Sequence, residues 1–98
     1  MFVRIVKMSF KEDAIDVFLE HFNKNKVCIR NFEGCRFLEL YRDQKNPNLF
    51  FTYSYWNTEA DLERYRHSDL FAAVWAKTKP LFNDKPEAWS VDKVASLQ

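Results

Sequence analysis

Glycine is nearly absent from this chain: Gly34 is the only one among 98 residues. Loops that cradle a phosphate group need several glycines at fixed spacing. The sequence therefore contains neither the dinucleotide-binding fingerprint nor the P-loop, which excludes nucleotide-binding enzymes of those two kinds.

An excess of one charge and long apolar runs are also missing. Fifteen basic and 14 acidic residues leave a net charge of +1, which gives no overall attraction to nucleic acid or an anionic membrane. No apolar run approaches the roughly 20 residues that span a bilayer. The first ten residues, MFVRIVKMSF, alternate like a strand and lack the cleavage site of a secretion signal. We expect a cytoplasmic protein that binds neither nucleic acid nor membrane.

Cysteine and histidine are scarce. Cys28, Cys35, His21 and His67 are the only residues of these two types, and their spacing matches no zinc pattern. We expect two reduced, partly buried thiols, a surface position for His21, and neither a metal nor another cofactor.

Aromatic residues, in contrast, are abundant at 17% of the chain, with ten phenylalanines. A chain of this length predicts a single domain over residues 1–98. Alternating and helical apolar spacing predicts strands at 2–8, 36–42, 49–56 and 88–94 and helices at 12–26, 58–67 and 68–78. This order indicates the α+β class, a ferredoxin-like (split βαβ) sandwich with a four-stranded antiparallel sheet.

Both faces of the predicted sheet carry large apolar side chains. In the strand at 49–56, one side holds Leu49, Phe51, Tyr53 and Tyr55, and the other holds Phe50, Thr52, Ser54 and Trp56. Helices cover only one face in such a fold, and an exposed aromatic face favours association. We therefore predict a homodimer that packs sheet to sheet around a two-fold axis.

Three segments carry a family resemblance: NFEGCRFLELYRD, NLFFTYSYWNTEADLERYRHSDLF and PEAWSVDKV. In this order they resemble the antibiotic biosynthesis monooxygenase (ABM) superfamily of dimeric α/β barrels over nearly the whole chain. The resemblance implies a pocket between the helices and the sheet of each subunit. Members include cofactor-independent oxygenases of quinols and polyketide phenols, haem-degrading enzymes and autoinducer-processing isomerases.

The resemblance favours the quinol-monooxygenase or uncharacterised branch over the haem-degrading one. Haem-degrading members use an Asn, a Trp and a His at places that hold Val6, Tyr65 and Trp75 in this chain. Without that His the chain has no evident proximal ligand for haem iron.

Tyr65 and His67 are the first candidates for chemistry. Tyr65 follows Leu62 by three residues on the inward stripe of its helix, where it is either a core tyrosine or a donor to a substrate oxygen. His67 is either an exposed imidazole at a helix end or a general base, since its ordinary pKa suits proton transfer at neutral pH. The neighbouring arginines, Arg64 and Arg66, are expected to be solvated.

Arg4 is the third catalytic candidate, because it shares a strand face with apolar residues that turn toward the helices. It either forms an ion pair with a carboxylate on the first helix or the second strand, or stabilises a substrate enolate or peroxide anion. The expected walls of the substrate pocket are Trp56, Trp75, Val6 and Phe71.

The resemblance, with which these residues are consistent, implies a cofactor-independent monooxygenase, an oxidoreductase acting on a small phenolic or quinol-type aromatic molecule. A non-catalytic ligand-binding or isomerase-type protein with the same fold remains an alternative. RNA binding, which also uses aromatic strands in a βαββαβ order, is disfavoured because the strand LFFTYSYW lacks the glycine of the RNA-binding motif.

Overall fold

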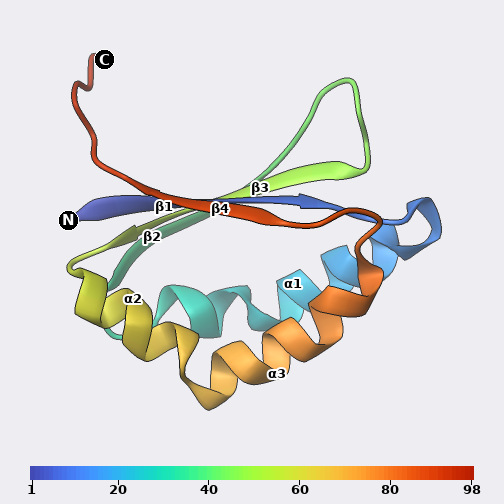
Figure 1. Cartoon of the computed structure of the whole chain (residues 1–98), viewed down its shortest axis with the longest axis horizontal. Helices are drawn as coiled ribbons and strands as arrows, with labels where there is room; N and C mark the ends of the chain where they lie inside the picture. The colour runs from blue at the N-terminus through green and yellow to red at the C-terminus, as the bar shows by residue number, and fades with distance from the viewer.

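The computed structural model describes residues 1–98 and places all three α-helices on one face of a four-stranded antiparallel sheet (Figure 1). The elements follow the predicted order, and two short 3-10 helices, η1 and η2, precede α1 and follow α3. In chain order they are β1 (Phe2–Ser9), η1 (Glu12–Ala14), α1 (Ile15–Arg30), β2 (Cys35–Arg42), β3 (Leu49–Trp56), α2 (Glu59–Arg66), α3 (Asp69–Thr78), η2 (Lys79–Leu81) and β4 (Glu87–Val91).

The strand order in the sheet is β2-β3-β1-β4, which is the ferredoxin-like arrangement that the sequence predicts. In the register, Arg4 of the central strand β1 lies between Ser54 of β3 and Ser90 of β4. A single chain forms an open sheet, so the closed barrel implied by the family resemblance requires a second copy.

The C-terminal ends of two elements lie three or four residues away from their predicted positions. Helix α1 continues to Arg30 rather than Lys26, because neither glycine nor proline interrupts it before Gly34. Gly34 has a φ of +90°, a value that favours glycine and permits the turn into β2. Strand β4 ends at Val91, three residues earlier than predicted. Thr58 caps the start of α2, since its Oγ1 accepts a hydrogen bond of 3.1 Å from Asp61 N–H.

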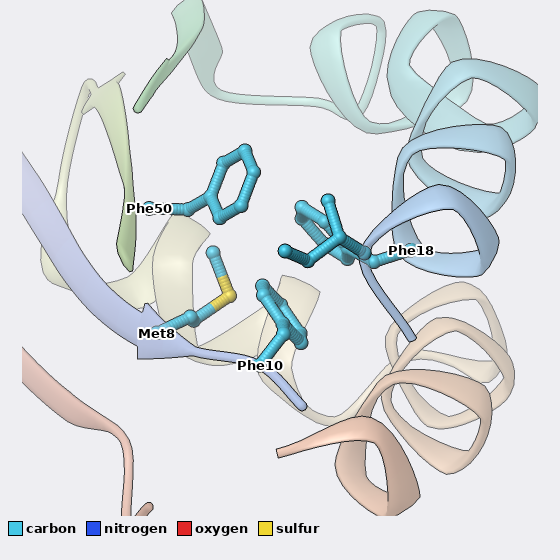
Figure 2. Packing of buried hydrophobic residues seen from close by; sticks show 5 residues of the cluster. Met8, Phe10, Phe18 and Phe50 are labelled. Atoms are coloured by element: carbon cyan, nitrogen blue, oxygen red, sulfur yellow. The ribbon is translucent and has the colours of Figure 1, made fainter. Parts of the chain in front are cut away.

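The main apolar core lies between α1 and one end of the sheet. We call it the closed cluster; it consists of Met8, Phe10, Ile15, Phe18 and Phe50. Figure 2 shows four of these side chains pointing toward one another from β1, β3, α1 and the segment after β1. The Phe10 and Phe18 rings stack at 4.0 Å, and the Phe10 and Phe50 rings meet edge to face at 5.6 Å. Such packing gives the helical layer a fixed position on the sheet.

His21 connects α1 to α3, which corrects its predicted surface position. Its Nε2 lies 3.0 Å from the Val74 carbonyl oxygen, and its Nδ1 lies 3.2 Å from Asn25 Nδ2. The imidazole tautomer that donates from Nε2 and accepts at Nδ1 satisfies both contacts. His21 is therefore half-buried and joins the two helices.

The two cysteines differ in exposure. Cys35 is buried as predicted, whereas Cys28 is exposed on α1, so the prediction of two partly buried thiols is wrong for Cys28. The chain has no helix with the length and apolar composition needed to cross a bilayer.

Candidate functional site

A cavity of about 340 Å³ lies between the helices and the sheet. This volume is at the lower end of the range of about 300–1,000 Å³ that is typical of small-ligand pockets. Every predicted site residue except His67 lines it: Arg4, Val6, Trp56, Tyr65, Phe71 and Trp75. Phe18, Phe22, Leu38 and Leu62 contribute further apolar surface. The cavity is therefore mostly apolar, with a few polar groups among the aromatic rings.

An unbroken run of aromatic rings forms one wall of the cavity. Tyr65 stacks on Trp56 at a centroid distance of 5.1 Å and meets Phe71 edge to face at 5.2 Å. Phe71 in turn stacks on Trp75 at 5.8 Å with an angle of 10° between the planes. We call these four residues the aromatic wall. Such rings can contact a flat aromatic ligand by stacking or edge to face.

The junction between α2 and α3 holds the middle of the aromatic wall. The Ser68 hydroxyl donates a hydrogen bond of 2.6 Å to the Tyr65 carbonyl and accepts one of 3.1 Å from Phe71 N–H. One N-cap side chain therefore fixes the end of α2 relative to the start of α3. This link sets the spacing between the Tyr65 and Phe71 rings.

Tyr65 lines the cavity. Its hydroxyl forms no hydrogen bond within the chain, and no fully buried side-chain oxygen or nitrogen lacks a partner, so the hydroxyl is accessible. Burial of the ring, with a smaller contribution from Cys35, raises the pKa of Tyr65 to about 12. The phenol therefore stays protonated at neutral pH and is a hydrogen-bond donor, not a base.

Arg4 contributes a guanidinium group to the same cavity. The predicted ion pair with a carboxylate on α1 or β2 is wrong: its Nη1 donates to Ser90 Oγ at 3.0 Å, and no carboxylate oxygen lies within 4.0 Å. The physical reason is the register, which sets Arg4 between two serines. Partial burial, reinforced by the nearby charge of Arg66, lowers the pKa of Arg4. This residue is a partly desolvated cation.

Arg66 also reaches the cavity, which corrects its predicted solvated position. It follows Leu62 by four residues, which puts both side chains on the same face of α2, and this spacing could have revealed it. Its Nη1 contacts Glu63 Oε1 at 2.8 Å. Arg64, in contrast, is absent from the cavity lining and pairs with Asp61 at 2.8 Å, in agreement with the prediction.

His67 does not reach the cavity. Its side chain is 79% exposed, and its Nε2 lies 3.3 Å from Glu63 Oε2. Side chains two residues apart on a helix differ in direction by about 200°. Because Tyr65 points inward, His67 therefore points outward. The predicted role of His67 as a general base therefore has no support from the geometry.

Three small polar residues of the sheet and α3 went unnoticed as cavity residues in the sequence. Thr52 and Ser54 of β3 share the helix-facing side with Trp56, and Thr78 ends α3. The Ser54 hydroxyl accepts a hydrogen bond of 2.9 Å from Trp56 Nε1, which fixes the indole. Thr78 Oγ1 donates to the Val74 carbonyl at 2.8 Å. No group of three or more His, Cys, Asp or Glu side chains is placed to hold a metal ion.

Solved structures with the same fold exist across nearly the full length of the chain. A crystal structure of an antibiotic biosynthesis monooxygenase superposes with a TM-score of 0.90 at 22% identity, covering 97% of this chain and 100% of the other. A conserved protein from Methanosarcina mazei Go1 gives 0.87 at 20% identity, covering 95% and 93%. Rv0793 from Mycobacterium tuberculosis gives 0.87 at 14% identity, covering 99% and 98%. Identities this low establish the shared fold alone.

The family match comes from the sequence itself. No protein with a curated function matches the chain. The family model described as antibiotic biosynthesis monooxygenase matches residues 1–77, which include β1 through most of α3 and the whole aromatic wall. The chain therefore belongs to the antibiotic biosynthesis monooxygenase family.

Proposed function

We propose that the protein is a cofactor-independent monooxygenase of a small phenolic or quinol-type substrate. The observation that carries this proposal is the aromatic wall, which lines the same 340 Å³ cavity as the hydroxyl of Tyr65 and the guanidinium of Arg4. The wall supplies a surface for a flat ring, and the two polar groups supply donors for an oxygen atom on that ring.

The reaction needs little from the protein. An ionised hydroquinone or anthrone-type phenol passes an electron to O₂, the two radicals combine into a peroxide, and the O–O bond then breaks. One oxygen atom stays on the substrate as a carbonyl, the other leaves as water with two hydrogens of the substrate, and the substrate supplies all four electrons that reduce O₂. Tyr65 and Arg4 would stabilise the negative charge on the substrate oxygen or the peroxide. The apolar walls would keep water from the radical pair.

Oxygen uptake tests this proposal. The purified protein is mixed with a panel of hydroquinones and anthrone-like phenols in an oxygen electrode, with no cofactor added. We expect uptake above the uncatalysed rate for at least one phenol and a loss of about tenfold or more in Tyr65→Phe, which removes one donor to the developing charge. No uptake across the panel, or full activity in Tyr65→Phe, would contradict the proposal.

Non-catalytic binding or isomerisation of a small aromatic ligand is the second candidate function. The observation that favours it is the absence of histidine, aspartate and cysteine from the cavity lining. Binding by thermal shift without oxygen uptake would support this candidate over the first.

We also propose that two copies associate through the sheet face that the helices leave open (Figure 1). This face carries Phe37, Phe51, Tyr53 and Tyr55, and its outer strands leave Tyr41 46% and Trp89 42% exposed. The tail after β4 begins on this face, where Lys93 lies 5.1 Å from the Tyr55 ring centroid. A second copy with the same surface would bury the aromatic rings of both chains.

Light scattering coupled to gel filtration tests the association. We expect twice the mass of one chain for the wild type and the mass of one chain for Tyr53→Arg, which puts a charge at the centre of the face. Val17→Arg is the matched control, because Val17 is 54% exposed on α1, which packs on the opposite face. A monomeric wild type would refute this proposal.

A further inference from the structure

The ionisable groups of the cavity can donate protons or carry positive charge, but none is placed to accept a proton. Among the lining residues these groups are Arg4, Arg66, Tyr65 and Glu87. The first two are cations. The pKa of Tyr65, raised to about 12, keeps its phenol neutral.

Glu87, the only carboxylate among them, is directed elsewhere. Its Oε1 lies 3.9 Å from Lys7 Nζ, and the register pairs the two residues across β1 and β4. Side chains alternate along a strand, so Lys7 and Glu87 share the open face, while Val6 and Ala88 face the helices. The Glu87 carboxylate is therefore not in position to take a proton from a ligand in the cavity.

The Arg4 guanidinium keeps one edge free. Only its Nη1 donates a hydrogen bond within the chain, to Ser90 Oγ. Its Nε and Nη2 have no partner, and they are accessible, because no fully buried side-chain nitrogen lacks a partner. This pair of N–H groups is the edge with which arginine binds an anionic oxygen most favourably.

The charges around Arg4 do not neutralise it. Arg66 and Glu63 of α2 act on it in opposite directions, and Arg66 has the larger effect on its pKa. Glu63 is itself shared between Arg66 Nη1 at 2.8 Å and His67 Nε2 at 3.3 Å. The neighbours on β3 and β4 are Ser54 and Ser90, which are uncharged. The cavity therefore presents a positive charge with unused donors.

We propose that the cavity binds its aromatic ligand as an anion, with Arg4 as the counter-ion, so that the substrate is a phenol or enol acidic enough to ionise on binding. The proton then leaves to solvent as the ligand enters, and the protein needs no general base. This inference deepens the proposed oxygenase function, since it narrows the substrate to the acidic phenols and enols. The proposed binding of an aromatic anion does not depend on any turnover.

The test uses 4-nitrophenol, which does not react with O₂ and whose ionised form absorbs at longer wavelength than its neutral form. Titrating the protein into 4-nitrophenol at several pH values gives the pKa of the bound phenol. An opposite charge within a few ångströms lowers a pKa by about 1–3 units. We therefore expect a bound pKa at least about one unit below the free value, which corresponds to at least tenfold tighter binding of the anion than of the neutral phenol.

Three variants locate the effect. Arg4→Met should abolish the pKa shift while the aromatic wall still binds the ring. Arg4→Lys, which keeps the charge without the paired N–H groups, should retain part of it and also serves if Arg4→Met fails to fold. Arg64→Gln is the matched control, because it removes an arginine of α2 that lies outside the cavity. It should leave the shift unchanged.

Each outcome decides the inference. A bound 4-nitrophenol that stays neutral in the wild type, or a shift that persists in Arg4→Met, overturns it. Equal binding of 4-nitroanisole, the uncharged methyl ether, also overturns it. Oxygen uptake with a neutral hydroquinone but no nitrophenol ionisation would leave the oxygenase proposal standing and refute the anion. Ionisation of bound 4-nitrophenol without oxygen uptake on any phenol would leave the anion proposal standing and refute the oxygenase proposal.

Discussion

Two apolar regions lie under the same face of the sheet, and they are built differently. The closed cluster contains only hydrocarbon and thioether side chains, and Phe10 and Phe50 are almost completely buried. The second region consists of the buried residues Cys35, Trp56 and Leu62, with Tyr65 packed against them. Its indole N–H and thiol are each satisfied within the chain, at Ser54 Oγ and the Phe37 carbonyl.

The difference separates stability from binding. The Phe10 and Phe50 rings fill their space completely and stabilise the packing of α1 on the sheet without bordering the cavity, whereas Met8 and Phe18 of the same cluster also line it. At the other end, the polar atoms that have partners fix the rings, while the Tyr65 hydroxyl and part of Arg4 stay free toward the cavity. A substitution should therefore affect folding at one end and ligand binding at the other.

The largest expected effect is in the closed cluster. Phe10→Ala should lower the free energy of unfolding by about 3–5 kcal/mol, because it leaves a cavity among three aromatic rings that cannot all collapse. Phe71→Ala in the aromatic wall should cost clearly less, since Phe71 already borders open space, but it should weaken ligand binding. Urea unfolding at one fixed protein concentration compares the two variants. Equal losses of stability would remove the distinction between the regions.

Gly34 joins β2 to the cavity end, and its replacement should have the next largest effect. Gly34→Ala should cost about 2–4 kcal/mol, because φ is +90° and the new methyl group would overlap the Asp61 side chain. Asp61 cannot move away freely, since it is bound to Arg64 and Thr58 at 2.8 and 3.0 Å. Thermal unfolding measures the loss, and Glu33→Ala on the exposed neighbour is the control. A stable Gly34→Ala protein would show that this turn rearranges.

Tyr65 should make stability fall at alkaline pH. The pKa of Tyr65 in the folded protein, about 12, lies above the ordinary value of 10. Its contribution to the free energy of unfolding is therefore fully present below about pH 10. Between these values the unfolded chain has lost the proton and the folded chain has kept it, and stability falls as pH rises, by up to about 2 kcal/mol near pH 12. Tyr65→Phe should show a smaller loss over this interval in chemical unfolding. Identical pH dependence in both proteins would contradict the burial of the phenol.

Of the substitutions considered, His21→Ala is expected to have the smallest effect on the free energy of unfolding. His21→Ala removes the contact between α1 and the Val74 carbonyl on α3, and a net loss of about 1 kcal/mol is typical of such a hydrogen bond. His67→Ala is the comparison, and its exposed side chain should leave stability unchanged. Unfolding in urea separates the two histidines. If both variants lost equal stability, His21 would not link the helices in solution.

The fold could be predicted almost completely from the sequence, because it depends on local patterns. Alternation along Leu49–Trp56 identified both faces of β3, and Thr58 identified the start of α2. The end of α1 was missed because no breaker follows Lys26, and the helix continues to Arg30, shortly before the turn that contains Gly34.

The orientation of a site residue could be predicted where helical periodicity sets it. The partner of a site residue could not be predicted where the pairing of distant strands sets it. The spacing of Tyr65 from Leu62 correctly predicted that Tyr65 points inward. The same rule predicts that Arg66 reaches the cavity and that His67 faces solvent. The partner of Arg4 could not be predicted, because Ser90 is 86 positions away and reaches Arg4 only through the pairing of β1 with β4.

The most direct test of the central claim is oxygen uptake by Arg4→Met, His67→Ala and the wild type, each with the same acidic phenol and no added cofactor. We predict full turnover in His67→Ala, since its imidazole lies outside the cavity, and a loss of at least about tenfold in Arg4→Met. Loss of turnover in His67→Ala with full activity in Arg4→Met would contradict the account. The chemistry would then require a base that this cavity does not contain.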